Sequence, residues 1–143
     1  MTTERRPKIL VVDDDAAITT TFQNILEGEG YEVTTATDGI RAIELARREA
    51  FDLVMLDMIM PRMDGLVTLR GLREVAPSAR VVILSAFIER EREAEALRLG
   101  AEAVLAKPPE LQKLLRFLHE TLRRDDPSGN SPSPQASRAS WTR

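Results

Sequence analysis

The 143-residue chain contains no cysteine and only one histidine, His119. Without cysteine it can form no disulfide, no thiolate zinc site and no cysteine nucleophile. A single histidine also argues against a histidine-rich metal centre and against a Ser-His-Asp triad. Any metal site in this protein would therefore have to rely on oxygen ligands.

Long apolar runs and dense charge of one sign are absent as well. No apolar stretch approaches the length of about 20 residues that crosses a bilayer, and residues 1–8 do not resemble a secretory signal. The net charge is −3 with both signs interspersed, without the basic block that is typical of nucleic-acid binding. We therefore expect one cytoplasmic domain that binds neither membranes nor nucleic acids.

Residues 125–143 differ in composition from the rest of the chain. They contain five serines, three prolines and one large apolar residue, Trp141. Such a segment cannot bury enough apolar surface to offset the entropy of ordering it. The sequence therefore predicts a domain over residues 6–124 and a disordered tail, or a truncated linker, over 125–143.

Short apolar runs alternate with helical spacing of apolar residues along the domain. The runs are Ile9–Val12, Leu53–Leu56, Val81–Leu84 and Ala103–Ala106, with a β-branched segment at Tyr31–Ala36. Runs without apolar–polar alternation are typical of parallel strands covered on both faces. Five such strand–helix units predict an α/β fold with helices on both sides of the sheet, where ligands bind beyond the carboxyl ends of the strands.

Carboxylates follow two of the predicted strands. Asp13, Asp14 and Asp15 follow the first strand, and Asp57 follows the third. Two carboxylates about 4 Å apart repel by roughly 4 kcal/mol at an effective dielectric of 20, so such a cluster raises its own pKa values or requires a cation. Oxygen ligands without histidine or cysteine indicate Mg²⁺.

Groups suited to an anion follow two further strands. Ser85 and the backbone N–H of Ala86 follow the fourth strand, and Lys107 follows the fifth. A metal ion, an ammonium group and aimed donors are typical of phosphoryl transfer. Because no glycine-rich nucleotide loop is present, the phosphoryl group would come from a small donor or another protein, and an aspartate would receive it.

Each of these residues also has an ordinary explanation when it is taken alone. Asp14 or Asp15 could cap the following helix, and Asp57 could lie in a turn. Ser85 could mark a helix entry, and Lys107 could be a solvated surface residue. Their occurrence after four different apolar runs favours a shared site.

Four stretches of the chain resemble the receiver domain of two-component response regulators, in the same order and spacing. They are KILVVDDD, DLVMLDMIMPRMDG, VVILSA and AKP, at Lys8–Asp15, Asp52–Gly65, Val81–Ala86 and Ala106–Pro108. The resemblance extends from about residue 6 to residue 123. It implies a flavodoxin-like (βα)5 fold with a five-stranded parallel sheet in order 2-1-3-4-5.

The resemblance also implies a metal site. Asp57 would accept the phosphoryl group and share in binding Mg²⁺. Asp14 would bind the ion directly, Asp13 would hold a metal-bound water, and the backbone carbonyl of Ile59 would complete the protein ligands.

The phosphoryl group would be held by residues at the other strand ends. Lys107 and Ser85 would contact its oxygens, together with the backbone N–H of Ala86. In relatives the Lys107–Pro108 bond is cis. Many receivers carry an aromatic residue three positions before the lysine; here that position is Val104, which is too small for the inward swing made by the aromatic ring.

The expected partners are proteins. A histidine kinase or a phosphotransfer protein would donate the phosphoryl group, and an output domain or a downstream protein would read it. The helix expected over residues 88–99 has a thin apolar face, mainly Ala94 and Leu97, which suits a movable element. In the last helix Phe117 lies off the main apolar stripe, and a homodimer through the last two helices is a possible arrangement.

Two alternatives remain open. The domain could be a degenerate receiver that acts as a constitutive docking platform, although the site residues are all present. It could also be a small Mg²⁺-dependent phosphohydrolase with an aspartyl nucleophile, but such enzymes place a second carboxylate two residues after the nucleophile, where this chain has Ile59. The favoured interpretation is a phospho-acceptor that catalyses only its own phosphorylation and dephosphorylation.

Overall fold

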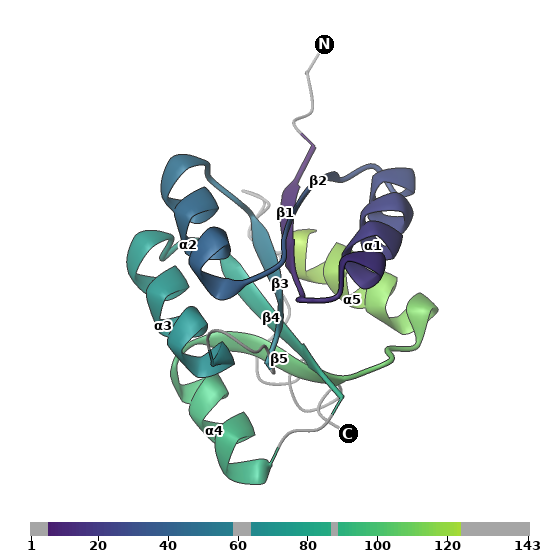
Figure 1. Ribbon diagram of the computed structural model, residues 1–143. Coiled ribbons are helices and arrows are strands. Elements are labelled where there is room, and N and C mark those ends of the chain that lie inside the picture. The colour runs from purple at the N-terminus through teal and green to yellow at the C-terminus, as the bar shows by residue number, and fades with distance from the viewer. Residues whose placement is uncertain (1–5, 59–63, 87–88, 124–143) are drawn as a thin grey trace.

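The computed structural model describes residues 6–58, 64–86 and 89–123. Within these ranges five strands alternate with five helices along the chain (Figure 1). The elements are β1 (Lys8–Val12), α1 (Ala16–Gly28), β2 (Glu32–Ala36), α2 (Gly39–Arg48), β3 (Leu53–Asp57), α3 (Gly65–Val75), β4 (Arg80–Ser85), α4 (Arg90–Arg98), β5 (Ala101–Ala106) and α5 (Leu111–Arg123). The predicted series of strand–helix units is confirmed. The proposed disordered segment 125–143 lies outside the described residues.

The strands form one parallel sheet in the order β2-β1-β3-β4-β5. In the centre of the sheet, Ile9 of β1 lies opposite Val33 of β2 and Leu53 of β3. Helices α1 and α5 cover one face, and α2, α3 and α4 cover the other (Figure 1). The predicted flavodoxin-like order is therefore confirmed.

Two apolar clusters fill the space between the sheet and its helices. Successive residues of each strand point to opposite faces, so Leu10 and Val54 pack under α2 and α3, whereas Ile9 and Met55 pack under α1 and α5. All four side chains are at most 1% exposed. Because both faces are buried, the strands contain continuous apolar runs.

Three helices begin at aspartates just beyond the carboxyl ends of strands. Asp15, Asp38 and Asp64 are the N-caps of α1, α2 and α3, and each carboxylate accepts a backbone N–H of the first turn. Of the two candidate caps of the first helix, Asp15 has this role. The side chain of Asp14 is therefore not used for capping. No helix in the described ranges is long and apolar enough to span a membrane.

Two expectations about the later helices are wrong. Phe117 is 1% exposed and belongs to the core, because the buried face of α5 is centred on positions 114, 117, 118 and 121 rather than on the leucines alone. In α4 the buried residue is Ala96, whereas Ala94 and Leu97 are only partly buried. The apolar stripe is broad in α5 and thin in α4. In both helices, packing against the sheet determines which residues of the stripe are buried.

Candidate functional site

Three carboxylates converge at the carboxyl edge of the sheet. Asp57 is the last residue of β3, and Asp13 and Asp14 directly follow β1, which is the neighbour of β3. One carboxylate oxygen from each lies within 4.8 Å of the others. Asp13 and Asp57 are buried, at 4% and 6% exposure, whereas Asp14 is exposed and opens the cluster to solvent.

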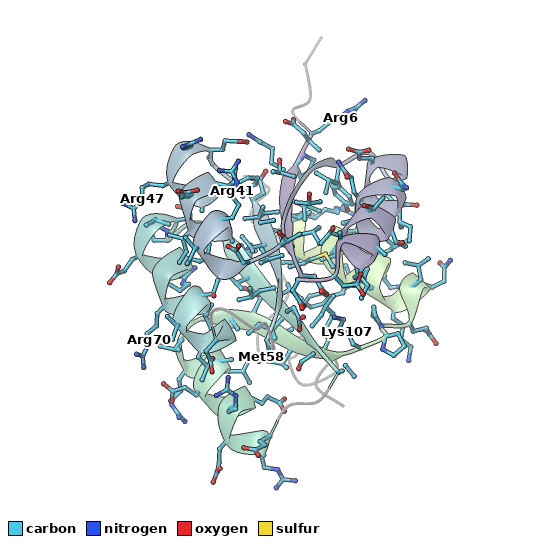
Figure 2. The ribbon with its side chains drawn as sticks, in the orientation of Figure 1. Arg6, Arg41, Arg47, Met58, Arg70 and Lys107 are labelled. Carbon is cyan, nitrogen blue, oxygen red and sulfur yellow. The ribbon has the colours of Figure 1, made fainter. Side chains whose placement is uncertain are left out.

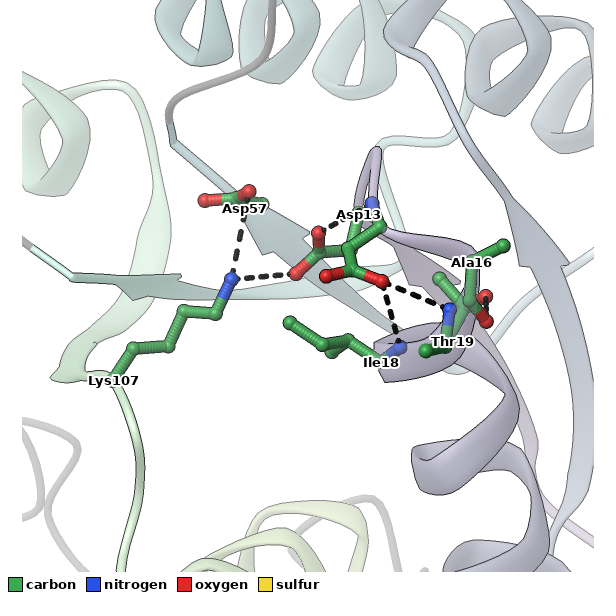
Figure 3. Close-up of polar contacts among 8 residues, drawn as sticks. Asp13, Ala16, Ile18, Thr19, Asp57 and Lys107 are labelled. Atoms are coloured by element: carbon green, nitrogen blue, oxygen red, sulfur yellow. Dashed lines mark hydrogen bonds and ion pairs between the residues drawn. The ribbon is translucent and has the colours of Figure 1, made fainter.

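Asp13 is held in position by three hydrogen bonds, of which Figure 3 shows the two that its carboxylate accepts. Its backbone N–H donates to the carbonyl of Ala36 at 3.1 Å. Its Oδ1 accepts the backbone N–H of Asp15 at 3.0 Å, and its Oδ2 accepts Lys107 Nζ at 2.6 Å. This carboxylate is therefore fixed before any ligand binds.

Lys107 carries a positive charge into the acidic cluster from the end of β5. Its Nζ lies 2.6 Å from Asp13 Oδ2 and 3.6 Å from Asp57 Oδ2. Partial burial lowers the pKa of Lys107, but the hydrogen bond that its ammonium group donates to Asp13 and the negative charge of Asp57 outweigh this effect, so the pKa is raised above its usual value. The ammonium group therefore stays protonated at neutral pH.

Lys107 is held in place through its backbone in addition to the contacts of its side chain. The Lys107 N–H donates to the carbonyl of Ser85 at 2.9 Å, and the Lys107–Pro108 peptide bond is cis, as the sequence resemblance implied. Ser85 ends β4 and is 2% exposed, and Ala86 follows it as an exposed residue. The structure thus places Ser85, Ala86 and Lys107 at the same edge as the carboxylates.

Two further sequence expectations concern Val104 and Ile59. Val104 is 4% exposed within the apolar core under α2, α3 and α4, so the position of the usual aromatic is filled by a buried aliphatic side chain. Ile59, whose carbonyl was expected to bind the metal, lies outside the described residues.

The donor set of the cluster fits a hard divalent cation. Three carboxylates and one ammonium group leave a formal charge of −2 at this edge, which one divalent ion would balance. All the side-chain ligands are oxygens, and Mg²⁺ typically uses one or two carboxylates and keeps several waters. Asp13, Asp14 and Asp57 would hold the ion.

Sequence reasoning missed a link between this edge and α4. Asp64 Oδ1 accepts both the Leu66 N–H and Arg92 Nη2, each at 2.7 Å. Partial burial raises the pKa of Asp64, but the bonds from Arg92 and Leu66 lower it more, so the net pKa lies below the usual 3.8. An aspartate before a helix signals a cap, whereas its pairing with an arginine 28 residues away has no sequence signal.

This pair makes stability depend on pH. A pKa lower in the folded than in the unfolded state stabilises the fold above pH 3.8, and this contribution is lost as the pH falls through the folded-state value. At pH 7 we expect the free energy of unfolding of the wild type to be higher than that of Asp64→Asn by at most about 1 kcal/mol, because solvent screens exposed ion pairs. Asparagine retains the cap, so urea unfolding should show the difference shrinking in acid; a difference that grows there would contradict the assignment.

The fold and site define a class: a doubly wound α/β domain with an acidic cluster, which could hold a cation, and a lysine at its strand ends. Residues 9–119 match the family model of the response regulator receiver domain, and the chain belongs to this family. The predicted family, fold and general function, a receiver domain of two-component response regulators, are thereby confirmed.

Individual relatives agree with this assignment. The chain is 42% identical over 114 residues to the transcriptional regulatory protein ZraR of Klebsiella oxytoca, a match over 80% of this chain and 26% of the relative. It is 37% identical over 127 residues to the response regulator MprA of Mycobacterium sp. (strain KMS), over 89% of this chain and 55% of that protein. The chain thus spans about a quarter to a half of the length of these relatives.

Solved structures show the same architecture. A CheY-like receiver domain protein from Methanospirillum hungatei JF-1 superimposes with a TM-score of 0.83 at 30% identity, over 87% of this chain and all of that chain. The receiver domain of the Francisella response regulator 1452 gives a TM-score of 0.77 at 32% identity, over 85% of this chain and all of that chain.

Proposed function

We propose that this domain accepts a phosphoryl group on Asp57 in a reaction that depends on Mg²⁺. The observation that carries the proposal is the convergence of three carboxylates within 4.8 Å, with Lys107 Nζ 3.6 Å from Asp57 Oδ2. Mg²⁺ held by Asp13, Asp14 and Asp57 would supply charge neutralisation to the transferring group.

The remaining residues act on the phosphoryl oxygens. A carboxylate oxygen of Asp57 attacks phosphorus, an O–P bond forms, and the bond from phosphorus to the donor atom breaks. Lys107 Nζ, the Ser85 hydroxyl and the Ala86 N–H supply positive charge and hydrogen-bond donors for the oxygens. Burial of Asp57 and Ser85 keeps bulk water from screening these interactions.

Both the donor of the phosphoryl group and the molecule that responds to the modification would be proteins. A histidine kinase or a phosphotransfer protein would supply the phosphoryl group, and an output domain or a downstream protein would respond to it. A homodimer through α4 and α5, and a cytoplasmic location, also belong to this proposal. The modification would act by shifting the balance between two conformations of the domain.

The proposal predicts a specific covalent product. After incubation with a small phosphodonor and Mg²⁺, intact-mass spectrometry should show the addition of one phosphoryl group to the wild type and none to Asp57→Asn. Chelation of the metal should prevent the gain. Mass gain by both proteins would place the acceptor elsewhere, and an unmodified wild type would favour a constitutive docking platform.

The same samples test the enzyme alternative. A phosphohydrolase would release phosphate continuously from a generic phosphomonoester, whereas a phospho-acceptor that depends on an activated phosphodonor would not use such an ester. Multiple turnovers that are lost in Asp57→Asn would overturn the proposal in favour of hydrolysis.

A further inference from the structure

Exposed large aliphatic side chains are few in the described part of the chain, and two of the three lie on the neighbouring helices α2 and α3. In the described part of the chain, three large hydrophobic side chains are exposed: Ile40 at 55%, Val67 at 49% and Leu111 at 39%. Ile40 lies in the first turn of α2, and Val67 lies in the first turn of α3. Single exposed aliphatics are ordinary, but a neighbouring pair is a candidate contact surface.

Ile40 and Val67 lie on adjoining faces of two neighbouring helices. Both helices start at the carboxyl edge of the sheet and run side by side over the same face (Figure 1). One turn further along, a Cβ on Gly71 would lie 2.4 Å from Ile43 Cδ1, so the two helices touch there. Ile40 is three residues before Ile43, and Val67 is four before Gly71, so both share these faces, one turn closer to the carboxyl edge.

The surface around this aliphatic pair is basic although the whole chain is acidic. Arg73 of α3 donates to the Ala79 carbonyl and is not part of this surface. The two helices otherwise carry four arginines and two glutamates, with Glu44 paired to Arg41, against a net charge of −3 for the chain. Arg47 and Arg70 point outward from α2 and α3 (Figure 2). Within the described ranges, Arg47 and Arg48 make no ion pair, and Arg70 reaches Glu95 only at 3.9 Å.

We propose that this surface docks an acidic segment of a partner protein that also presents apolar side chains. We call it the α2–α3 face and define it by Ile40, Arg41, Arg47, Arg48, Val67 and Arg70. A second copy of the chain is a poor occupant, because it would bring arginines against arginines. A nucleic acid would use the arginines but would leave the aliphatic pair without a partner.

This docking role is separate from phosphoryl transfer at Asp57. It needs no phosphoryl group, so its test uses unmodified protein, with Asp57→Asn expected to behave as wild type. Failure of docking would leave the proposed phosphorylation unaffected, and the absence of phosphorylation would leave the docking result standing.

Three synthetic helical peptides serve as probes. The first has a leucine stripe flanked by glutamates, the second replaces the glutamates by lysines, and the third replaces the leucines by serines. Titrated into the full chain and followed by amide chemical shifts, the first should perturb α2 and α3. The second should not bind, and the third should bind at least about tenfold more weakly.

Variants of the protein locate the contact. Ile40→Ser with Val67→Ser should weaken binding of the first peptide at least about tenfold, and Arg47→Glu with Arg48→Glu should do the same through charge. Leu111→Ser removes the third exposed aliphatic, on α5, and should change nothing. The proposal would be overturned if the first peptide does not bind, if all three peptides bind equally, or if the chemical-shift changes are centred on other helices. It would also be overturned if Leu111→Ser weakens binding as much as the double substitution of Ile40 and Val67. Binding of duplex DNA that depends on Arg47 and Arg48 but not on Ile40 and Val67 would also overturn it.

Discussion

Replacing Lys107 with methionine is expected to slow phosphoryl uptake on Asp57 by at least about 100-fold while tightening Mg²⁺ binding. The slower reaction follows because the substitution removes the positive charge 3.6 Å from Asp57 Oδ2 that would contact the phosphoryl oxygens. Mg²⁺ binds more tightly because the ammonium group lies 2.6 Å from Asp13 Oδ2 and competes with a cation for that oxygen.

The two effects are measured separately. Isothermal titration of Mg²⁺ into unmodified protein reports the affinity, and the time course of intact mass with a small phosphodonor reports the rate. Lys113→Met is the matched control, since Lys113 is an exposed lysine on α5 that makes no ion pair with the carboxylate cluster in the described part of the chain. Equal rates for the two variants would remove Lys107 from the reaction, and weaker Mg²⁺ binding in Lys107→Met would show that the two cations do not compete.

Replacing Asp14 with asparagine is expected to weaken Mg²⁺ binding by at least about 100-fold without loss of folded stability. Asp14 is the exposed member of the carboxylate cluster, and no hydrogen bond or ion pair of its side chain occurs within the described part of the chain. Loss of its charge therefore removes a ligand from the cation without leaving a buried group unpaired.

The adjacent residue offers a close control. Asp15 is also exposed, but its Oδ1 accepts the N–H groups of Ala17 and Ile18 and caps α1. Asparagine caps a helix about as well as aspartate, so Asp15→Asn should retain both stability and Mg²⁺ affinity. Similar losses of affinity in the two variants would indicate a general effect of surface charge and would contradict a specific site.

The order of elements and the members of the site could be predicted from the sequence because both depend on local patterns. Apolar runs without alternation indicate strands buried on both faces, and helical spacing after each run indicates the covering helices. Since all strands of a parallel sheet end at one edge, Asp13, Asp57 and Lys107 had to lie at the same edge whatever their exact distances.

The sequence did not indicate how these side chains pair. Lys107 is closer to Asp13 than to Asp57, by 2.6 Å against 3.6 Å, and this difference depends on strand spacing and on the path of the backbone after β5. The Asp64–Arg92 contact likewise requires α3 and α4 to lie side by side. Ion pairs between distant segments leave no periodic signal in a single sequence.

The apolar pattern and the strand-end residues determined an α/β fold with an acidic edge, and the resemblance of four stretches indicated the receiver-domain family. Tertiary packing decided which side of each helix is buried: Phe117 and Ala96 lie in the core, whereas Ile40 and Val67 remain exposed on the neighbouring helices α2 and α3. The physical reason is that periodicity shows that a helix has an apolar side, whereas the exact rotation of the helix depends on the shape of the sheet and of the neighbouring helices against which it packs.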